Sequence, residues 1–387
     1  MTGALPILVA GGGIGGLSAA VALARTGIPV HVLEAAPDFA ELGAGLQIGP
    51  NGMRILARWG LAEGLAREAK SPERLLLKDG LTGEGLASLP LGAAAEARYG
   101  APYLVMTRHV LHRHLLAAAR AAPNVTISQG VRIADWSQNG GRVIASLGTG
   151  GGGVEGRALV AADGVHSALR DRLFRGARAV PSGRTALRAL APAPRGGEAS
   201  AVTVWMAPDA HLVHYPVGAE GRLNLVAVLR DADVPAGDSV ASAAVQAAFG
   251  RWAFEPQLLL AGGEGWLKWP LWTMEPLDHW ARGPVALLGD AAHPVLPFLA
   301  SGAVMAIEDA AILAQEVGRS REDCAAAFAR YEQRRIPRLA RLRKAVTRTG
   351  GIYHMGGLMR LARNAALAAL PESALLARND WLYGFDT

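Results

Sequence analysis

The N-terminal segment constrains the fold of this chain more than any other. Residues 5–10 (LPILVA) are apolar and predict a short buried strand, and residues 14–26 predict a helix that ends at Gly27 and Pro29. Residues 30–34 (VHVLE) predict a second strand. A strand, a helix and a strand in this order are typical of a βαβ unit with parallel strands, so we expect an α/β fold.

The glycine-rich sequence GGGIGG joins the first strand to the helix and fits the pattern G-x-G-x-x-G. In this pattern Gly11 makes the tight turn, Gly13 lets the backbone reach a pyrophosphate, and Gly16 lets the helix pack closely on the strand. The helix begins at Ile14 and Gly15, where its N–H groups and its dipole attract phosphate groups. We therefore predict a dinucleotide site at this turn.

An acidic residue follows at the distance that this motif requires. Glu34 ends the second predicted strand, about 20 residues after the glycines, and can accept hydrogen bonds from ribose hydroxyl groups. We include Ala35, which follows it directly, among the predicted cofactor-binding residues. The motif alone does not distinguish NAD from FAD. It occurs once, so a nicotinamide donor would find no second domain of this kind in the chain.

The first 24 residues are apolar enough to suggest a signal peptide or a membrane span. The glycines between residues 11 and 16 and the lack of a preceding basic region argue against both. A single cysteine, Cys324, allows no internal disulfide and fits a reducing compartment. We therefore expect a cytoplasmic protein that has no membrane partner.

The chain carries a formal net charge of +6. This charge either attracts anions such as dinucleotides and aromatic acids or belongs to a basic surface without a partner. The densest basic run comprises Arg334, Arg335, Arg338, Arg341, Arg343, Lys344 and Arg348. No aromatic residues are interleaved with it, so we predict a solvated helix face and no nucleic-acid partner.

Two further buried strands, residues 157–162 and 284–288, run directly into acidic residues. Asp163 follows the first strand and Asp290 follows the second. An Asp-Gly pair can be an ordinary turn. However, the carboxyl ends of parallel strands meet at one edge of a sheet, where such sheets bind ligands, so we expect both aspartates close to the glycine turn.

The middle of the chain predicts a different architecture. Residues 201–206, 211–217 and 222–229 alternate between inward and outward side chains and have turn residues between them. Residues 74–90 predict a hairpin, and GTGGGG at 148–153 predicts a hairpin tip. We expect an antiparallel sheet that is inserted into the α/β part.

The strand 211–217 contains a pair of residues suited to acid–base chemistry. His211 and Tyr215 share one face of a strand with Val213, whereas His214 points to the other face. A histidine that titrates near neutral pH can remove or share a phenolic proton. The alternative is that both residues belong only to the core of the sheet.

Helices are predicted over residues 108–121, 301–317 and 322 to about 348, the last with a break near Pro337. His112 and His114 are expected on the surface of the first of these helices. No His or Cys residues cluster at metal-ligand spacing, so we predict no metal site.

Three segments together carry a family resemblance. They are GGGIGGLSAAVALARTGIPVHVLEA, AADGVHSALR and VALLGDAAHPVLPFLASGAVMAIEDA, and in this order they resemble the class A FAD-dependent aromatic monooxygenases of the para-hydroxybenzoate hydroxylase superfamily. ELGAGLQIGPNGMRIL, HLVHYPV and DWLYGFD resemble the branch of salicylate hydroxylases, 3-hydroxybenzoate 6-hydroxylases and 6-hydroxynicotinate 3-monooxygenases. The resemblance extends over essentially the whole chain.

The resemblance implies an enzyme with bound FAD that uses NADH or NADPH and O2. It would hydroxylate a phenolic or hydroxypyridine aromatic acid through a flavin hydroperoxide, with or without decarboxylation. Two alternatives stay open: a flavoprotein reductase or oxidase that inserts no oxygen, and a non-enzymatic binding protein that has kept the dinucleotide fold. The expected oligomeric state is a monomer or a homodimer.

The resemblance also implies cofactor contacts. By it, Arg108, Asp163 and Asp290 contact FAD, and Gly302 and Ala303 begin a helix that offers N–H groups to the flavin. The proline-rich loop before that helix, with Pro294, Pro297 and Phe298, would line the flavin ring.

For the substrate, the resemblance implies a base at His211 and an orienting residue at Tyr215, with Gln47 and Pro297 beside them. Many family members have Gln or His after Phe-Leu-Ala, and here the residue is Ser301. This departure leaves the substrate open. No arginine for a substrate carboxylate is evident in the sequence.

We expect a Rossmann-like FAD-binding domain, an antiparallel substrate domain inserted into it, and a helical C-terminal segment. The FAD-binding domain would comprise residues 1–71, 101–176 and 266–350. The substrate domain would comprise residues 72–100 and 177–265, and the C-terminal segment residues 351–387.

Overall fold

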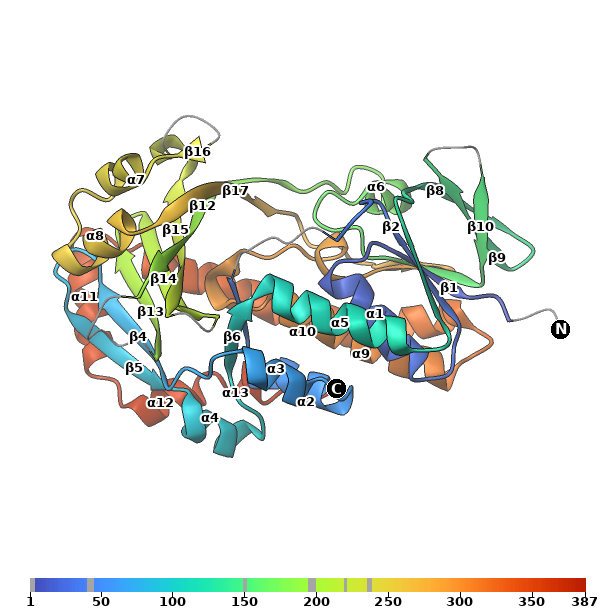
Figure 1. The fold of residues 1–387 in the computed structure, drawn as a ribbon, viewed down its shortest axis with the longest axis horizontal. Helices are drawn as coiled ribbons and strands as arrows, with labels where there is room; N and C mark the ends of the chain where they lie inside the picture. Colours follow the sequence, from blue (N-terminus) through green and yellow to red (C-terminus); the bar gives the residue numbers. More distant parts are fainter. Residues whose placement is uncertain (1–3, 40–44, 149–151, 194–199, 219–220, 235–238) are drawn as a thin grey trace.

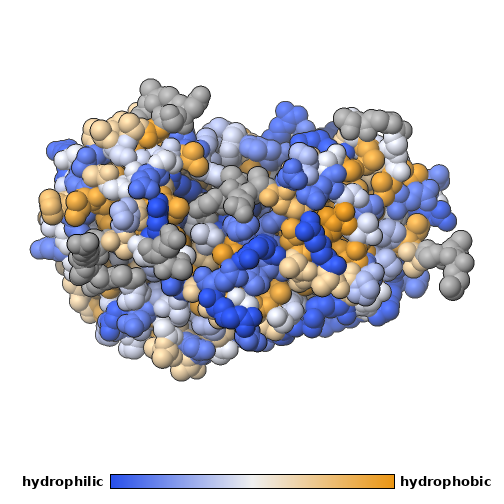
Figure 2. Space-filling model, in the orientation of Figure 1, coloured by the Kyte–Doolittle hydropathy of each residue, from blue (hydrophilic) through white to orange (hydrophobic). Residues whose placement is uncertain are grey.

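The computed structural model describes residues 4–39, 45–148, 152–193, 200–218, 221–234 and 239–387. Two large sheets lie toward opposite ends of an elongated molecule, and long helices connect the two ends (Figure 1). Polar and apolar residues are interspersed over the face of the molecule in Figure 2. Among the described residues, no helix is both long enough and apolar enough to cross a membrane.

The first sheet has six strands in the order β18-β19-β11-β1-β2-β7. Their bounds are Ala281–Arg282 (β18), Val285–Leu287 (β19), Ala158–Ala161 (β11), Ile7–Ala10 (β1), Val30–Glu34 (β2) and Val125–Gln129 (β7). All neighbouring pairs are parallel except β18–β19. The predicted βαβ unit and the parallel strands are thus confirmed, and the ends of β1, β11 and β19 lie side by side.

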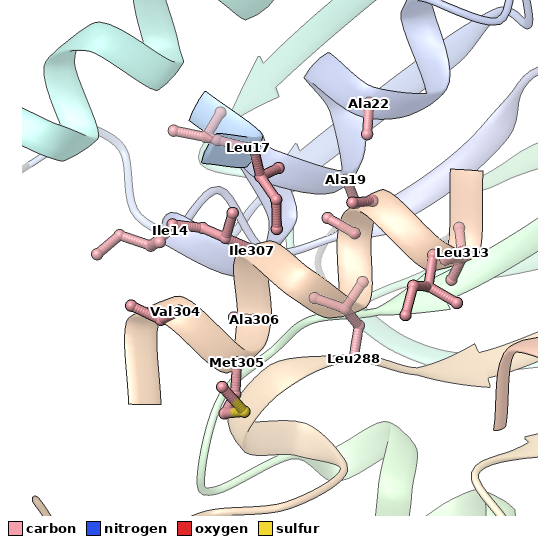
Figure 3. Packing of buried hydrophobic residues seen from close by; sticks show 14 of the residues in the cluster. Ile14, Leu17, Ala19, Ala22, Leu288, Val304, Met305, Ala306, Ile307 and Leu313 are labelled. Carbon is pink, nitrogen blue, oxygen red and sulfur yellow. The ribbon is translucent and has the colours of Figure 1, made fainter. Parts of the chain in front are cut away.

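Helices α1 (Ile14–Ala24) and α9 (Gly302–Arg319) pack against each other beside this sheet. Leu17 of α1 lies against Ile307 of α9, within a cluster of small and aliphatic side chains (Figure 3). Gly15 lets α1 lie close to the end of β19, because a Cβ there would lie only 3.0 Å from Leu288 Cδ2. Helix α5 (Arg108–Ala121) has the predicted boundaries, and it packs on α1.

The second sheet has eight strands in the order β16-β17-β12-β15-β14-β13-β4-β5. Their bounds are Ser239–Val240 (β16), Glu264–Thr273 (β17), Val180–Pro192 (β12), Arg222–Arg230 (β15), Ala210–Val217 (β14), Ala201–Ala207 (β13), Arg74–Asp79 (β4) and Gly85–Pro90 (β5). The inserted antiparallel strands and the hairpin β4–β5 are confirmed, but β13 and β4 pair in parallel. Strand β17 continues past residue 265, and the domain division itself stays a prediction.

Further strands and helices lie outside the two large sheets. They are β3 (Gly45–Ile48), α2 (Pro50–Arg58), α3 (Ala62–Glu68), α4 (Gly92–Tyr99), β6 (Leu104–Thr107), β8 (Ile133–Asn139), β9 (Arg142–Leu147), β10 (Gly153–Gly156), α6 (Ala168–Leu173), α7 (Ser242–Ala248) and α8 (Phe254–Ala261). Strands β9 and β10 form an antiparallel pair, and residues 149–151 of the predicted hairpin tip lie outside the described residues.

Helix α10 (Cys324–Tyr353) continues through Pro337, so the predicted break is wrong. Proline removes one helical hydrogen bond and crowds the preceding turn. Buried side chains on both sides of it, including Tyr331, Leu339 and Leu342, hold the flanking turns in the core. This packing offsets the local cost of the proline.

The predicted solvated face of α10 is wrong for part of the basic run. Arg335 is fully buried and Arg338 nearly so. The Arg335 guanidinium lies 2.6 Å from both Glu308 Oε2 and Asp309 Oδ1, and Arg338 Nη2 lies 3.0 Å from Glu308 Oε1. The two carboxylates of α9 are buried and need opposite charges beside them, and α10 supplies these charges.

The C-terminal segment is helical, with α11 (Gly357–Ala368), α12 (Glu372–Ala377) and α13 (Asp380–Tyr383). Helices α11 and α12 pack against β5 of the eight-stranded sheet (Figure 1). The chain end returns to α2, where Arg54 donates hydrogen bonds to the carbonyl oxygens of Tyr383 and Phe385.

Candidate functional site

Two cavities adjoin where the glycine turn meets the eight-stranded sheet. The first, which we call the loop cavity, has a volume of about 350 Å³ and is bordered by Gly13 and by the start of α9. The second, the apolar cavity, has a volume of about 210 Å³ and lies against β4, β5 and β13. The residues that border both cavities are Gln47, His211, Val213, Pro297 and Ala300.

The glycines of the turn have different constraints. Gly11 has a φ of +102°, and a Cβ there would lie 2.5 Å from the carbonyl oxygen of Ala162. At Gly16 a Cβ would lie 1.9 Å from the carbonyl oxygen of Gly11. At Gly13 a Cβ would meet no atom within 4 Å, because this residue faces the loop cavity. The turn therefore fits a group that approaches the backbone at Gly13.

The Glu34 carboxylate is fixed against this turn. Its Oε2 accepts a hydrogen bond from Gly12 N at 2.5 Å, and its Oε1 accepts one from Ala36 N at 2.7 Å. Glu34 and Ala35 lie beside the glycine turn and not on the cavity wall. His112 is half-buried on α5, and its ring lies 2.8 Å from the carbonyl oxygen of Gly12.

The two aspartates at the strand ends differ. The Asp163 carboxylate accepts hydrogen bonds from Ser167 Oγ and Leu169 N, at 2.5 and 3.3 Å, and so caps α6. Ala162 and Gly164, on either side of Asp163, border the loop cavity, whereas Asp163 itself does not. Asp290 borders this cavity with its side chain, which is exposed to it. Burial in the surrounding protein raises the pKa of Asp290.

Two arginines border the loop cavity. Arg108 begins α5, as the sequence predicts. Arg188 on β12 was not predicted, and its guanidinium lies 5.2 Å from the ring centre of Trp269. Among the described residues, Arg188 Nε has no hydrogen-bond partner. Burial lowers the pKa of Arg188, but an arginine remains charged, so this side chain offers a positive charge to the cavity.

His211 and Tyr215 share one face of β14, as predicted, and both border the loop cavity. His214 is buried on the other face, where its ring stacks on Trp205. His211 Nδ1 lies 2.8 Å from Nε2 of His354, the residue that directly follows α10. Burial lowers the pKa of His211 well below its usual value and lowers that of His354 to about 4, so both imidazoles are neutral at pH 7.

Other polar groups near His211 bind one another. Tyr103, which the sequence did not single out, donates a hydrogen bond to Gln47 Oε1 at 2.6 Å. Ser301 donates to the carbonyl oxygen of Leu299 at 2.7 Å, which turns its hydroxyl onto its own loop. Burial raises the pKa of Tyr215, so its hydroxyl stays protonated.

The proline-rich loop forms part of both walls. Val295 and Pro297 border the loop cavity, and Phe298 borders the apolar cavity. Pro294 is buried and is not among the residues that border the two cavities, and its contact with the flavin stays a prediction. Gly302 and Ala303 lie at the start of α9 on the cavity wall, where the first N–H groups of a helix have no partner within it.

The family model described as "FAD binding domain" matches residues 4–346. The chain is 34% identical to 3-hydroxybenzoate 6-hydroxylase from Polaromonas naphthalenivorans, over 99% of this chain and 96% of the relative. It is 33% identical to 6-hydroxynicotinate 3-monooxygenase from Bordetella bronchiseptica, over 100% and 96%. The structure of Klebsiella pneumoniae HpxO with FAD and uric acid is similar, with a TM-score of 0.86 at 28% identity over 99% and 98%.

The chain belongs to this family and is an FAD-dependent aromatic monooxygenase. The loop cavity of the monooxygenase fits FAD, because the turn leaves Gly13 open to a pyrophosphate and the start of α9 presents unpartnered N–H groups. Residues that would hold FAD are Gly13, Ile14, Gly15, Arg108, Asp290, Gly302 and Ala303. In the part of the monooxygenase that the structure describes, no three His, Cys, Asp or Glu side chains group as a metal site.

Proposed function

We propose that this monooxygenase hydroxylates a phenolic or hydroxypyridine ring, held beside His211 at the junction of the two cavities. The main support for this proposal is that His211 borders both the cavity that fits FAD and the apolar cavity next to it. The names of the relatives, which act on 3-hydroxybenzoate and 6-hydroxynicotinate, support an aromatic substrate with a ring hydroxyl.

In the net reaction, one oxygen atom of O2 enters the ring and the other leaves as water, with two electrons from NADH or NADPH. Bound FAD supplies the electron transfer to O2. The protein must make the ring electron-rich, and removal of the phenolic proton does this. The imidazole of His211 is neutral at pH 7 and has a lone pair that can accept this proton. Its lowered pKa makes it a weaker base than a free imidazole, so transfer of the proton onward must draw the step forward.

The proton then needs a way out of a buried site. His211 Nδ1 can donate to His354 Nε2, and His354 is partly exposed, so the proton passes outward through the second imidazole. Tyr215 and the Gln47–Tyr103 pair orient the ring by hydrogen bonds to its polar substituents. The positive charge of Arg188 favours anionic groups in the loop cavity.

We place this enzyme in the cytoplasm as a monomer or a homodimer. The single cysteine and the use of NADH or NADPH support this location. Light scattering of the purified protein measures its oligomeric state directly.

The test is turnover in ¹⁸O2 with a panel of hydroxybenzoates, hydroxynicotinates and neutral phenols. We expect one labelled oxygen atom in the product for each NADH or NADPH consumed. Oxidation of NADH without label in any aromatic product would favour a reductase or an oxidase. In the same assay, His211→Ala should keep bound flavin but form less product per NADH consumed.

A further inference from the structure

Much of the wall of the apolar cavity is aliphatic, and its polar lining residues are Gln47, Tyr103, His211, Thr349, Tyr353, Asn379 and Tyr383. On the eight-stranded sheet, alternate residues of three adjacent strands face it: Leu75 and Leu77, Ala87 and Leu89, and Val202 and Val204. Leu367 of α11 and Leu375 of α12 close it from the opposite side. Because side chains two apart on a strand share a face, these three strands present one continuous aliphatic surface.

Polar groups at the shared wall mark one end of this cavity. Gln47 and His211 lie where it joins the loop cavity, and Tyr103 is hydrogen-bonded to Gln47. Phe298 packs its ring edge-to-face on the His211 ring at 5.3 Å, so an aromatic surface adjoins the proton-accepting group. Because His211 borders both cavities, a ring with its hydroxyl at His211 can place another substituent in the apolar cavity, against the aliphatic wall.

The apolar cavity offers no oppositely charged partner for a charged group of the substrate. No Lys, Arg, Asp or Glu side chain borders the apolar cavity in the described parts of the chain. Arg188 borders the loop cavity instead, on the other side of the shared wall. Thr349, Asn379 and Tyr383 bring hydrogen-bonding groups to this wall, but a carboxylate buried in the apolar cavity would have no cation beside it, which is unfavourable.

We infer that the substrate is a phenol whose ring carries an apolar substituent, such as an alkyl or aryl group, and that this substituent occupies the apolar cavity. This inference rests on the proposed function, because it assigns the ring hydroxyl to His211. It goes beyond the relatives, whose named substrates carry a carboxylate.

The test compares 3-propylphenol with 3-hydroxybenzoate. Both have a phenolic hydroxyl, and they differ only in the group meta to it, which is a propyl group in one and a carboxylate in the other. Each is titrated into the FAD-loaded protein, and the dissociation constant is measured from the flavin difference spectrum and by calorimetry. We expect 3-propylphenol to bind at least tenfold more tightly. Tighter binding of 3-hydroxybenzoate, or no binding of 3-propylphenol, would overturn the inference.

Two variants locate the substituent. Leu77→Arg places a cation in the apolar cavity and should reverse the preference between the two ligands, whereas Leu267→Arg makes the same change at an exposed position of this sheet and should leave it unaltered. Leu77→Phe fills the cavity without a charge and should weaken 3-propylphenol at least tenfold but leave unsubstituted phenol unchanged. Equal effects of Leu77→Phe on both phenols would contradict the inference.

The outcomes also separate this inference from the proposed function. If 3-hydroxybenzoate binds more tightly and is hydroxylated with labelled oxygen, the apolar substituent is wrong and the monooxygenase function stands. If no phenol in the panel perturbs the flavin or gains labelled oxygen, both are wrong.

Discussion

His211 Nδ1 lies 2.8 Å from His354 Nε2, which joins an imidazole at the wall of both cavities to one that is partly exposed. The two residues are 143 positions apart, on β14 and at the end of α10. Burial is the main cause that lowers the pKa of His354. Arg184, Asp209 and Arg363 lie near it, and their net positive charge lowers this pKa further. Both imidazoles are therefore neutral at pH 7.

His354→Ala should interrupt this proton path. We expect hydroxylation to slow on the order of 100-fold, the usual scale for a lost general acid–base group, while flavin content and flavin reduction by NADH stay unchanged. Imidazole added to the buffer should restore part of the rate, since it can occupy the vacated space. His114→Ala, which removes a histidine paired with Glu68 on α5, is the control and should change neither rate. A purely structural role of His354 predicts no rescue by imidazole.

The glycine turn allows a matched pair of substitutions. Gly16→Ala places a Cβ 1.9 Å from the Gly11 carbonyl oxygen and should destabilise the FAD-free protein by about 1–3 kcal/mol. Gly13→Ala meets no protein atom and should change this stability by about 0.5 kcal/mol or less, but it should weaken FAD binding. Urea unfolding and fluorescence titration with FAD measure the two effects. Unchanged FAD affinity of the Gly13 variant would place the pyrophosphate elsewhere.

The buried ion pairs between α9 and α10 should be necessary for stability. Arg335→Met leaves the carboxylates of Glu308 and Asp309 without one of their cations, and we expect a loss of about 3–5 kcal/mol in the free energy of unfolding. Arg348→Met on the exposed part of the same helix should change it by no more than about 0.5 kcal/mol. Chemical denaturation of the two variants at pH 7 gives the comparison, and equal stabilities would contradict the network.

His214 should make the protein sensitive to acid. Burial lowers the pKa of His214 to about 3, whereas a histidine in an unfolded chain has its usual pKa of about 6.5. Between these pH values the unfolded chain binds a proton that the folded chain does not, so stability falls as the pH falls from 6.5 toward 3. His214→Phe removes this proton and should make the free energy of unfolding decline less steeply below pH 6.5. Parallel pH profiles of the variant and the parent would show that His214 is protonated in the folded protein.

Much of the site could be predicted because its signals are local. The order of strand, glycine turn and helix, the positions of Asp290 and Ser301 after strand and loop, and the shared face of His211 and Tyr215 all follow from spacing along one segment. The continuous helix at Pro337 could not be predicted in this way, because packing from distant segments outweighs the local preference of proline.

Local sequence patterns were enough to predict the α/β framework, the dinucleotide turn and the face of β14 that carries His211 and Tyr215, because glycine sterics and strand alternation act over a few residues. Three features appear only in the folded chain: His354 lies against His211, Arg188 borders the loop cavity, and Arg335 is buried. Each of these depends on which distant elements pack together, and whether a charge is solvated or buried is set by that packing and not by its neighbours in the chain.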